Sequence, residues 1–463
     1  MSEVTPISKI KKAYFVGIGG VSMSSLALIL KNRGVSVSGY DMYRSDNTKM
    51  LEETGVEIDY EHNLAKLSDV DTVIYTAAVN KQTAPELQYA EDNNISLLTR
   101  AELLGMVTES FRYSVGVSGT HGKSTTTGMI SEIYMTFDKE SSVISGCILP
   151  SVGKSFKIGT NDRVVFEACE YKDSFLSMRP SLKLVLNCKL DHVDYFKNLD
   201  QIIDSFSKFI STPRSCPFDD DAALVNLDCE NAVCAAKKTN SSIKYYSIIQ
   251  KTDFWANNIK FENGYGVFDL FSNDKVLIEN IKLSVPGIHN VSNAVAAAGS
   301  AIMTGIDLNS VKNGLENFTG VARRFEKKGV YNGAVVVDDY AHHPDEIKVT
   351  LTAAKNMGMK NIICVFQPHT YSRTKALLNE FAETLSLADK VYLAEIYPAR
   401  ETNIYGISSK DLQDLIPNSE FCMSFEEIAD RLSQDAEEGT LIITMGAGEA
   451  YKCGDILLKN AID

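Results

Sequence analysis

Long apolar runs are missing from this 463-residue sequence. No stretch approaches the roughly 20 consecutive apolar residues that a membrane-spanning helix requires. The first residues, Met1-Ser2-Glu3-Val4, lack the apolar core of a secretory signal. We therefore expect no membrane span and a cytoplasmic location.

Positive charge is also in short supply. The 46 lysines and arginines face 60 acidic residues, which gives a net charge of −14. A broad basic surface for nucleic acid is therefore not expected, although local cationic sites for anionic substrates are.

Paired cysteines are absent as well. The nine cysteines are scattered and odd in number, with no Cys-x-x-Cys pair, which disfavours a disulfide framework or a zinc site.

Histidine is rare, but it is placed in polar clusters. Of seven histidines, six lie in short segments rich in Gly, Asn, Asp or His, which favours chemical roles: His121, His192, His289, His342, His343 and His369.

A chain of this length is too long for one core, and its pattern predicts three α/β domains in series, over residues 1–110, 111–322 and 323–463. The first domain has apolar strand candidates at 13–16, 35–40 and 72–75. Between the first two lies Gly17-Ile18-Gly19-Gly20-Val21-Ser22, and Asp41 follows the second. This is the pattern of a fold that binds a nucleotide diphosphate at a helix N-terminus. Because Ser22 replaces the last glycine of the fingerprint, a nicotinamide cofactor and another diphosphate nucleotide both remain open.

The segment 119–126, Gly-Thr-His-Gly-Lys-Ser-Thr-Thr, is the most informative in the chain. It follows the apolar run 113–117 and precedes a helical pattern, as in a phosphate-binding loop. Lys123 would reach the terminal phosphates, and the Ser124 hydroxyl would ligate magnesium. The usual motif has a glycine where Val117 stands, so the match is to a shortened loop.

Two candidate partners of the loop follow strands of the second domain. Glu170 comes after the strand candidate 164–166, and His192 comes after 184–186. Ligands of open α/β sheets gather at the carboxyl ends of strands, so both side chains are expected to face the loop. A helix is predicted over about 290–304.

The third domain returns to alternating strands and helices. Strands are predicted at 334–337, 362–366, 390–393 and 441–444, with a helix over 374–385, so a parallel sheet is expected. Polar clusters follow its strands: Asp338-Asp339-Tyr340-Ala341-His342-His343-Pro344 after the first, and Arg373 after the second. Arginines of this kind bind carboxylates or phosphates in a bidentate manner.

Taken together, these segments resemble the Mur ligases of peptidoglycan synthesis over nearly the whole chain. The resemblance is carried, in order, by 119–125, 167–170, Asp191-His192, Gly287-Ile288-His289-Asn290 with Asn293, Arg323-Arg324-Phe325, 339–344 and 367–373. A loop that lacks the early glycine is itself typical of this family.

The resemblance implies ATP- and Mg²⁺-dependent ligation of L-alanine to the lactyl carboxylate of UDP-N-acetylmuramate through an acyl phosphate. It implies a Rossmann-like UDP-binding domain, a central P-loop ATPase-type domain and a C-terminal Rossmann-like amino-acid domain. A monomer or weak homodimer is expected, with domain closure on binding.

The site residues that the resemblance implies fall into five groups. The UDP-sugar group is Gly17, Gly19, Gly20, Ser22, Asp41 and Thr76. The ATP group is Gly119, Thr120, His121, Gly122, Lys123, Ser124, Thr125, His289, Asn290, Asn293, Arg324 and Asp339. The amino-acid group is Tyr340, His342 and Arg373; the metal group is Ser124, Glu170 and His192; and the catalytic group is Lys123, Glu170, His192, His342 and Arg373.

Two departures from the family pattern bear on these roles. Ser22 stands where the family often has glycine, and Thr370 stands where many members have arginine, which leaves Arg373 with less help at a carboxylate. Lys208 lies near the position of a modified lysine in some relatives, and no role is assigned to it.

Three other activities remain as alternatives. A sister ligase would attach a tripeptide instead of L-alanine and would share the nucleotide sites. A nicotinamide dehydrogenase would use the first domain but would leave the phosphate loop unexplained. An ATP-driven switch would hydrolyse ATP without forming an amide.

Overall fold

The computed structural model describes residues 7–76, 79–192, 195–214, 222–399 and 401–460. The chain packs into two compact units. Unit 1 comprises residues 1–247, 252–254 and 296–314, and unit 2 comprises 248–251, 255–295 and 315–463. Among the described residues, no helix is both long and apolar enough to cross a bilayer.

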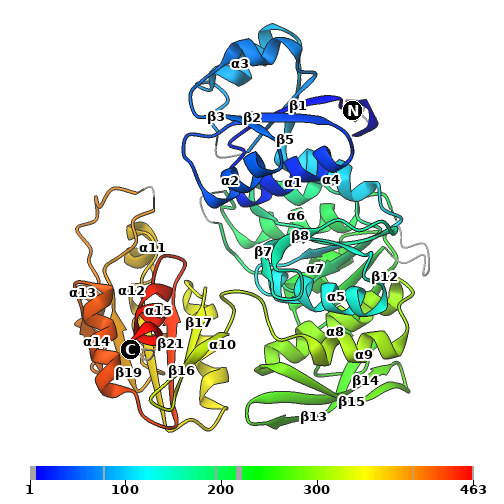
Figure 1. Ribbon diagram of the computed structural model, residues 1–463. Helices are drawn as coiled ribbons and strands as arrows, with labels where there is room; N and C mark the ends of the chain where they lie inside the picture. The colour runs from blue at the N-terminus through cyan, green and yellow to red at the C-terminus, as the bar shows by residue number, and fades with distance from the viewer. Residues whose placement is uncertain (1–6, 77–78, 193–194, 215–221, 400, 461–463) are drawn as a thin grey trace. The chain divides into compact units, whose positions relative to one another are not determined.

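The first sheet of unit 1 is parallel, in the order β3-β2-β1-β4-β5. Its strands are β1 (Lys12–Val16), β2 (Ser36–Tyr40), β3 (Glu57–Asp59), β4 (Thr72–Tyr75) and β5 (Ser96–Thr99). Helices α1 (Val21–Asn32), α2 (Asp46–Glu53) and α4 (Arg100–Glu109) cover one face, and α3 (Pro85–Asp92) covers the other (Figure 1). Short 3₁₀ turns, η1 (Ile7–Lys9) and η2 (Leu64–Asp69), complete this part.

The second sheet of unit 1 has its phosphate-loop strand in the interior. This sheet has ten strands in the order β15-β14-β13-β12-β11-β10-β6-β9-β7-β8, and from β12 to β8 all neighbours are parallel except the β7–β8 hairpin. The strands from β12 to β8 are β6 (Tyr113–Ser118), β7 (Ser142–Leu149), β8 (Lys154–Lys157), β9 (Arg163–Glu167), β10 (Leu182–Val185), β11 (Ala223–Asn226) and β12 (Ile243–Ser247). The helices are α5 (Lys123–Phe137), η3 (Tyr171–Ser177), α6 (Leu199–Ile210) and α7 (Glu230–Lys237). Because β9 and β10 both pair with β6, their carboxyl ends flank the loop that follows β6.

Unit 2 begins with an antiparallel meander, β13 (Phe254–Glu262), β14 (Tyr265–Ser272) and β15 (Lys275–Pro286). The turns at Asn263-Gly264 and Asn273 lie between these strands, and all three residues have positive φ, as tight hairpins require. Helices α8 (Ile288–Met303) and α9 (Leu308–Asn317) follow in the sequence, and residues 296–314, which include parts of both helices, belong to unit 1.

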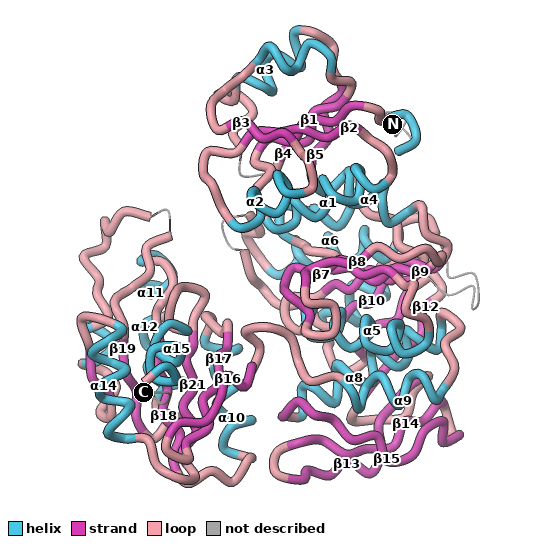
Figure 2. The backbone as a smooth tube through the Cα atoms, in the orientation of Figure 1, coloured by secondary structure: helices cyan, strands magenta, loops and turns pink. Residues whose placement is uncertain are grey.

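The last sheet, also in unit 2, has the order β16-β17-β21-β18-β19-β20, with only its β16–β17 pair antiparallel. Its strands are β16 (Glu326–Tyr331), β17 (Ala334–Asp339), β18 (Asn361–Phe366), β19 (Lys390–Leu393), β20 (Ser419–Phe421) and β21 (Thr440–Met445). Residues of α10 (Pro344–Lys355), α12 (Leu378–Leu385) and α13 (Lys410–Gln413) belong to one apolar core, and residues of α14 (Phe425–Asp435) and α15 (Tyr451–Lys459) belong to another; α11 (Tyr371–Ala376) directly precedes α12. Figure 2 shows the helices of this part in cyan beside the magenta strands.

The predicted α/β architecture is confirmed, and one element is corrected. The helix expected over 374–385 begins earlier, at Tyr371, and is broken into α11 and α12. The break lies at Leu377, whose φ of −117° and ψ of 26° interrupt the helical backbone. The apolar spacing of the segment did not reveal this, because two short helices on one face keep the same periodicity.

Candidate functional site

The phosphate loop joins the end of β6 to the start of α5. Gly122 caps α5 with a φ of 86°, and Gly119 has a φ of 145°, both of which disfavour side chains. A Cβ atom at Gly119 would also lie 3.0 Å from Leu186 Cβ and 3.1 Å from the Asn187 nitrogen. The loop is therefore a tightly packed turn whose glycines are sterically required, as a loop that holds phosphate with its backbone needs to be.

The segment that follows β10 supports this loop. The sequence analysis did not predict this supporting role. Asn187 accepts from the His121 N–H (2.8 Å) and donates through Nδ2 to the His121 carbonyl (2.9 Å). The Lys189 N–H donates to Thr120 Oγ1 (2.9 Å). These bonds fix the backbone of the loop from a neighbouring strand. An amide side chain directly after an apolar strand was the available signal in the sequence.

Lys123 and Glu170 meet at the base of the loop. Lys123 Nζ lies 3.1 and 3.2 Å from the two carboxylate oxygens of Glu170, and it also donates to the carbonyls of Gly119 (2.5 Å) and Thr120 (3.2 Å). The Glu170 side chain is fully buried. Burial is the largest single influence and by itself would lower the pKa of Lys123, but the charges of Glu170, Cys169 and Glu167 and the hydrogen bond to Glu170 together outweigh it, and the pKa is raised. The lysine is therefore a cation held in place by a buried carboxylate.

His192 and Ser124 lie with this pair in unit 1. His192 Nε2 is 3.8 Å from Glu170 Oε1, and the His192 ring packs on Tyr171 with centroids 4.7 Å apart. Ser124 is in the first turn of α5, and its hydroxyl has no recorded hydrogen-bond partner in the described part of the chain. Within that same part, no group of three or more His, Cys, Asp or Glu side chains forms a metal cage. A carboxylate, an imidazole nitrogen and a hydroxyl are groups that fit Mg²⁺ when water and phosphate oxygens complete its coordination, since this ion seldom has an all-protein cage.

The glycine loop of the first domain is organised by Asp41. The Gly19 N–H donates to Asp41 Oδ2 (2.7 Å), and the N–H groups of Gly17 and Ile18 donate to the Tyr40 carbonyl. Gly20 caps α1 without a side-chain hydrogen bond. A Cβ atom on Gly17 would lie 3.4 Å from Thr76 Cγ2, so Thr76 borders the loop. Asp41, expected to bind the UDP-sugar, thus has one carboxylate oxygen hydrogen-bonded to the loop itself.

Asp339 ends β17 in unit 2, and its carboxylate is almost completely buried. It accepts hydrogen bonds from the N–H groups of Ala341 (2.7 Å) and Phe325 (2.9 Å). Burial raises the pKa of Asp339 to about 6, against the opposing charge of Arg324. Arg324 lies over the Tyr340 ring, 5.6 Å from its centroid, and Nη1 is 3.9 Å from Glu346.

The expected amino-acid residues cluster in unit 2 around a histidine that the site prediction did not include. The Tyr340 and His342 rings are in edge contact, with centroids 5.4 Å apart, and those of His342 and His369 are 6.0 Å apart. Arg373 Nη1 lies 3.5 Å from His369 Nδ1, and Tyr397 stacks on the His369 ring. Burial lowers the pKa of His369 to about 4 and also lowers that of His342, so both imidazoles are neutral at pH 7.

Two of the three polar residues at the start of α8, Asn290 and Asn293, are joined by a hydrogen bond. Asn290 Nδ2 donates to the Pro286 carbonyl (2.7 Å), and Asn293 Nδ2 donates to Asn290 Oδ1 (3.1 Å). Burial lowers the pKa of His289 to about 4. These residues therefore form a neutral polar cluster.

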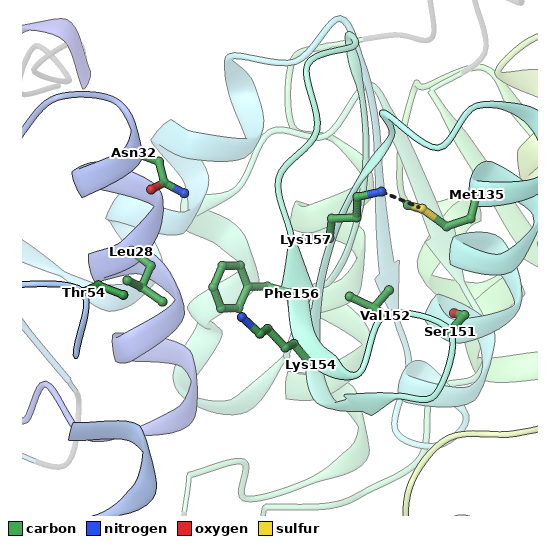
Figure 3. A pocket seen from close by; sticks show the side chains of 9 residues that line it. All are labelled: Leu28, Asn32, Thr54, Met135, Ser151, Val152, Lys154, Phe156 and Lys157. Atoms are coloured by element: carbon green, nitrogen blue, oxygen red, sulfur yellow. Dashed lines mark hydrogen bonds between the residues drawn. The ribbon is translucent and has the colours of Figure 1, made fainter. Parts of the chain in front are cut away.

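A separate cavity of about 510 Å³ lies in unit 1, and none of the predicted site residues lines it. Leu28 and Asn32 of α1 face Phe156 of β8 across it, and Met135 of α5 borders it (Figure 3). These positions are toward the carboxyl ends of α1 and α5, whereas the two glycine loops precede their N-termini.

Fold and sites together define a three-domain α/β protein of the phosphate-loop class. Three family profiles match in order: "Mur ligase family, catalytic domain" over residues 12–112, "Mur ligase middle domain" over 117–301 and "Mur ligase, glutamate ligase domain" over 323–448. The chain belongs to the Mur ligase family.

Individual relatives are similar over nearly their whole length. A UDP-N-acetylmuramate–L-alanine ligase of Caldicellulosiruptor bescii is 43% identical over 455 residues, which is 97% of this chain and 99% of the relative. One of Acetivibrio thermocellus is 44% identical, covering 98% and 97%. Among solved structures, the UDP-N-acetylmuramate–alanine ligase of Thermotoga maritima matches with a TM-score of 0.79 and 26% identity over 97% of this chain and 98% of that one.

Proposed function

We propose that this protein ligates L-alanine to the lactyl carboxylate of UDP-N-acetylmuramate at the expense of ATP, in the cytoplasmic synthesis of peptidoglycan precursors. The observation that carries the proposal is the full-length similarity to relatives of that activity at 41–44% identity. The buried Lys123–Glu170 pair under a phosphate loop supplies the chemical basis. The domain roles follow the order 1–110 for the UDP-sugar, 111–322 for ATP and 323–463 for the amino acid.

The first step transfers the γ-phosphoryl group of ATP. A lactyl carboxylate oxygen attacks the γ-phosphorus, the bond to the β-phosphate oxygen breaks, and ADP leaves. Both reactants are anionic, so their repulsion has to be offset by fixed positive charge. Lys123 and the loop N–H groups supply that charge in this chain. Ser124, Glu170 and His192 would hold Mg²⁺, which contributes further neutralisation of the phosphates.

The second step forms the amide. The amine of L-alanine attacks the acyl carbon, inorganic phosphate leaves, and the nitrogen gives up a proton. His342 is suited to accept it. Its Nδ1 lies 2.9 Å from the Tyr340 carbonyl, which can only accept, so Nδ1 carries the hydrogen and Nε2 is left as a base. Arg373 would bind the L-alanine carboxylate, and Tyr340 would border it.

The direct test is mass spectrometry of the product formed from UDP-N-acetylmuramate, ATP, magnesium and L-alanine. The expected product has the mass of the two substrates joined with loss of water, together with one ADP and one phosphate per amide. Omitting the UDP-sugar serves as the control: ATP hydrolysis that continues at the same rate without it would indicate a switch and contradict the proposal.

The amine specificity needs a separate measurement. Phosphate release is compared with L-alanine and with the cell-wall tripeptide at equal concentrations. Faster turnover with the tripeptide would show that the amine substrate is a peptide and not L-alanine. The proposed nucleotide chemistry would be unchanged.

A further inference from the structure

Arg100 occupies an electrostatically unfavourable position. It is the first residue of α4, directly after β5, where the helix dipole presents its positive end. A cation there is destabilising, whereas an anion is favoured. The nearby acid of the first turn, Glu102, is already engaged, because its Oε2 accepts from the Thr99 N–H (2.7 Å) and the Thr99 hydroxyl (2.8 Å).

The guanidinium of Arg100 is also largely buried without a counter-charge. One nitrogen, Nη1, donates to Ser22 Oγ (3.2 Å), which is a neutral acceptor. Burial lowers the pKa of Arg100, and the Cys169 thiol opposes this weakly. Across the described ranges of the chain, no Asp or Glu lies within ion-pair distance of this arginine. A guanidinium has five N–H donors, so within the described part of the chain most of its hydrogen-bonding capacity is left for solvent or a ligand.

The hydrogen bond to Ser22 shows where this charge is placed. Ser22 is in the first turn of α1, directly after the glycine loop. That turn contains no acidic residue, and Gly20 caps it without a side chain. Arg100 therefore adds a positive charge at the helix start that the proposed function assigns to the UDP moiety.

We infer that Arg100 is a binding residue for the diphosphate of the UDP-sugar. This inference rests on the proposed function. An anion seated between the α1 N-terminus and Arg100 would satisfy the unused donors and neutralise a buried charge. A diphosphate has enough oxygens to accept from both the backbone N–H groups and the planar guanidinium fork. Ser22, in place of a glycine, holds the arginine toward this position.

The test is direct binding of UDP and of UDP-N-acetylglucosamine, measured by calorimetry without ATP. Both probes carry the diphosphate but lack the lactyl carboxylate. Arg100→Met is expected to weaken both about 10- to 100-fold, because hydrogen bonds from a charged donor to phosphate are lost. Arg100→Lys keeps the charge but not the planar guanidinium fork, so its affinity for each probe should lie between that of the unmodified protein and that of Arg100→Met.

Arg33→Met is the matched control. Arg33 lies at the other end of α1, is partly buried, and donates to Ser110 Oγ (3.0 Å), much as Arg100 donates to Ser22. This variant should bind both probes like the unmodified protein. The ligand-free Arg100→Met protein should unfold at or above the unmodified temperature, since an uncompensated buried charge has been removed. A merely structural arginine would give the opposite shift.

Three results would overturn or separate these ideas. Equal affinity of Arg100→Met and Arg33→Met for both probes would refute the inference. If Arg100→Met weakened the binding of UDP-N-acetylmuramate but not that of UDP or UDP-N-acetylglucosamine, Arg100 would bind the lactyl carboxylate. That result would refute the diphosphate assignment. Because binding needs no turnover, an unmodified protein that binds UDP but makes no alanyl product would contradict the proposed function and leave this inference standing.

Discussion

Replacing Lys123 with methionine tests both the chemistry and the stability of the phosphate loop. Methionine keeps much of the length of the side chain but removes its charge and all its donors. The Lys123 side chain is 16% exposed and that of Glu170 is 0% exposed, so the lost ion pair is a buried one. The carbonyls of Gly119 and Thr120 lose a donor at the same time.

Two magnitudes follow from this geometry. Removal of one preorganised electrostatic group typically lowers turnover about 10²- to 10³-fold. Breaking a buried ion pair by deleting one partner typically costs about 3–5 kcal/mol of unfolding free energy. We expect the lower end of that range. The Lys123 side chain is partly open to water, and in the variant water would take the place of the lost ammonium group beside Glu170. Lys123→Met should therefore be nearly inactive and about 3 kcal/mol less stable without ligands.

Phosphate release measures the first quantity, and urea unfolding measures the second. Lys123→Met combined with Glu170→Gln is the decisive comparison, because it leaves no unpaired charge. The double variant should be more stable than Lys123→Met alone. Turnover of Lys123→Met within threefold of the unmodified rate, or a double variant less stable than the single one, would refute this reasoning.

Other substitutions probe the remaining sites. Asp339→Asn should gain stability relative to the unmodified protein as pH rises from about 4 to about 6, because the raised pKa of the buried acid makes its ionisation unfavourable in the fold; thermal unfolding across pH checks this, and a constant difference would contradict it. Asn187→Ala should raise the KM for ATP about tenfold through the loss of both hydrogen bonds to His121, and unchanged initial rates at low ATP would count against the supporting role. Gly287→Ala should cost about 1–3 kcal/mol, since φ is +94° and the new Cβ would lie 2.6 Å from His289 Cε1; an unshifted urea midpoint would show that the ring moves aside freely.

The phosphate-loop group could be predicted because it depends on strand ends. β9 and β10 pair with β6 on its two sides, so the residues just past their carboxyl ends converge on the loop. Glu170 and His192 occupy those positions and contact each other. A short apolar run followed by polar residues is visible in a sequence, and the topology of parallel sheets supplies the rest.

Other features depend on contacts that no local pattern encodes. Asn187 resembles an ordinary turn residue until β10 is placed beside β6. Arg100 reads as a solvated residue at the start of a helix, and its significance comes from Ser22, 78 positions away in the sequence. Asp41 is predicted to bind the UDP-sugar, but its hydrogen bond from Gly19 depends on how the loop packs. Such roles depend on contacts between residues far apart in the sequence, which a single sequence does not reveal.

The engagement of Lys123 in the ligand-free protein has a thermodynamic consequence. Its ammonium group already donates to the carbonyls of Gly119 and Thr120 and to the Glu170 carboxylate, so binding a triphosphate requires it to exchange partners. That exchange leaves the buried Glu170 carboxylate short of positive charge, a deficit that a divalent cation removes. Nucleotide and metal affinities should therefore be coupled, and by the same factor in both directions. In Glu170→Gln, which lacks this carboxylate, the ratio of the ATP dissociation constant without Mg²⁺ to that with Mg²⁺ should fall toward one.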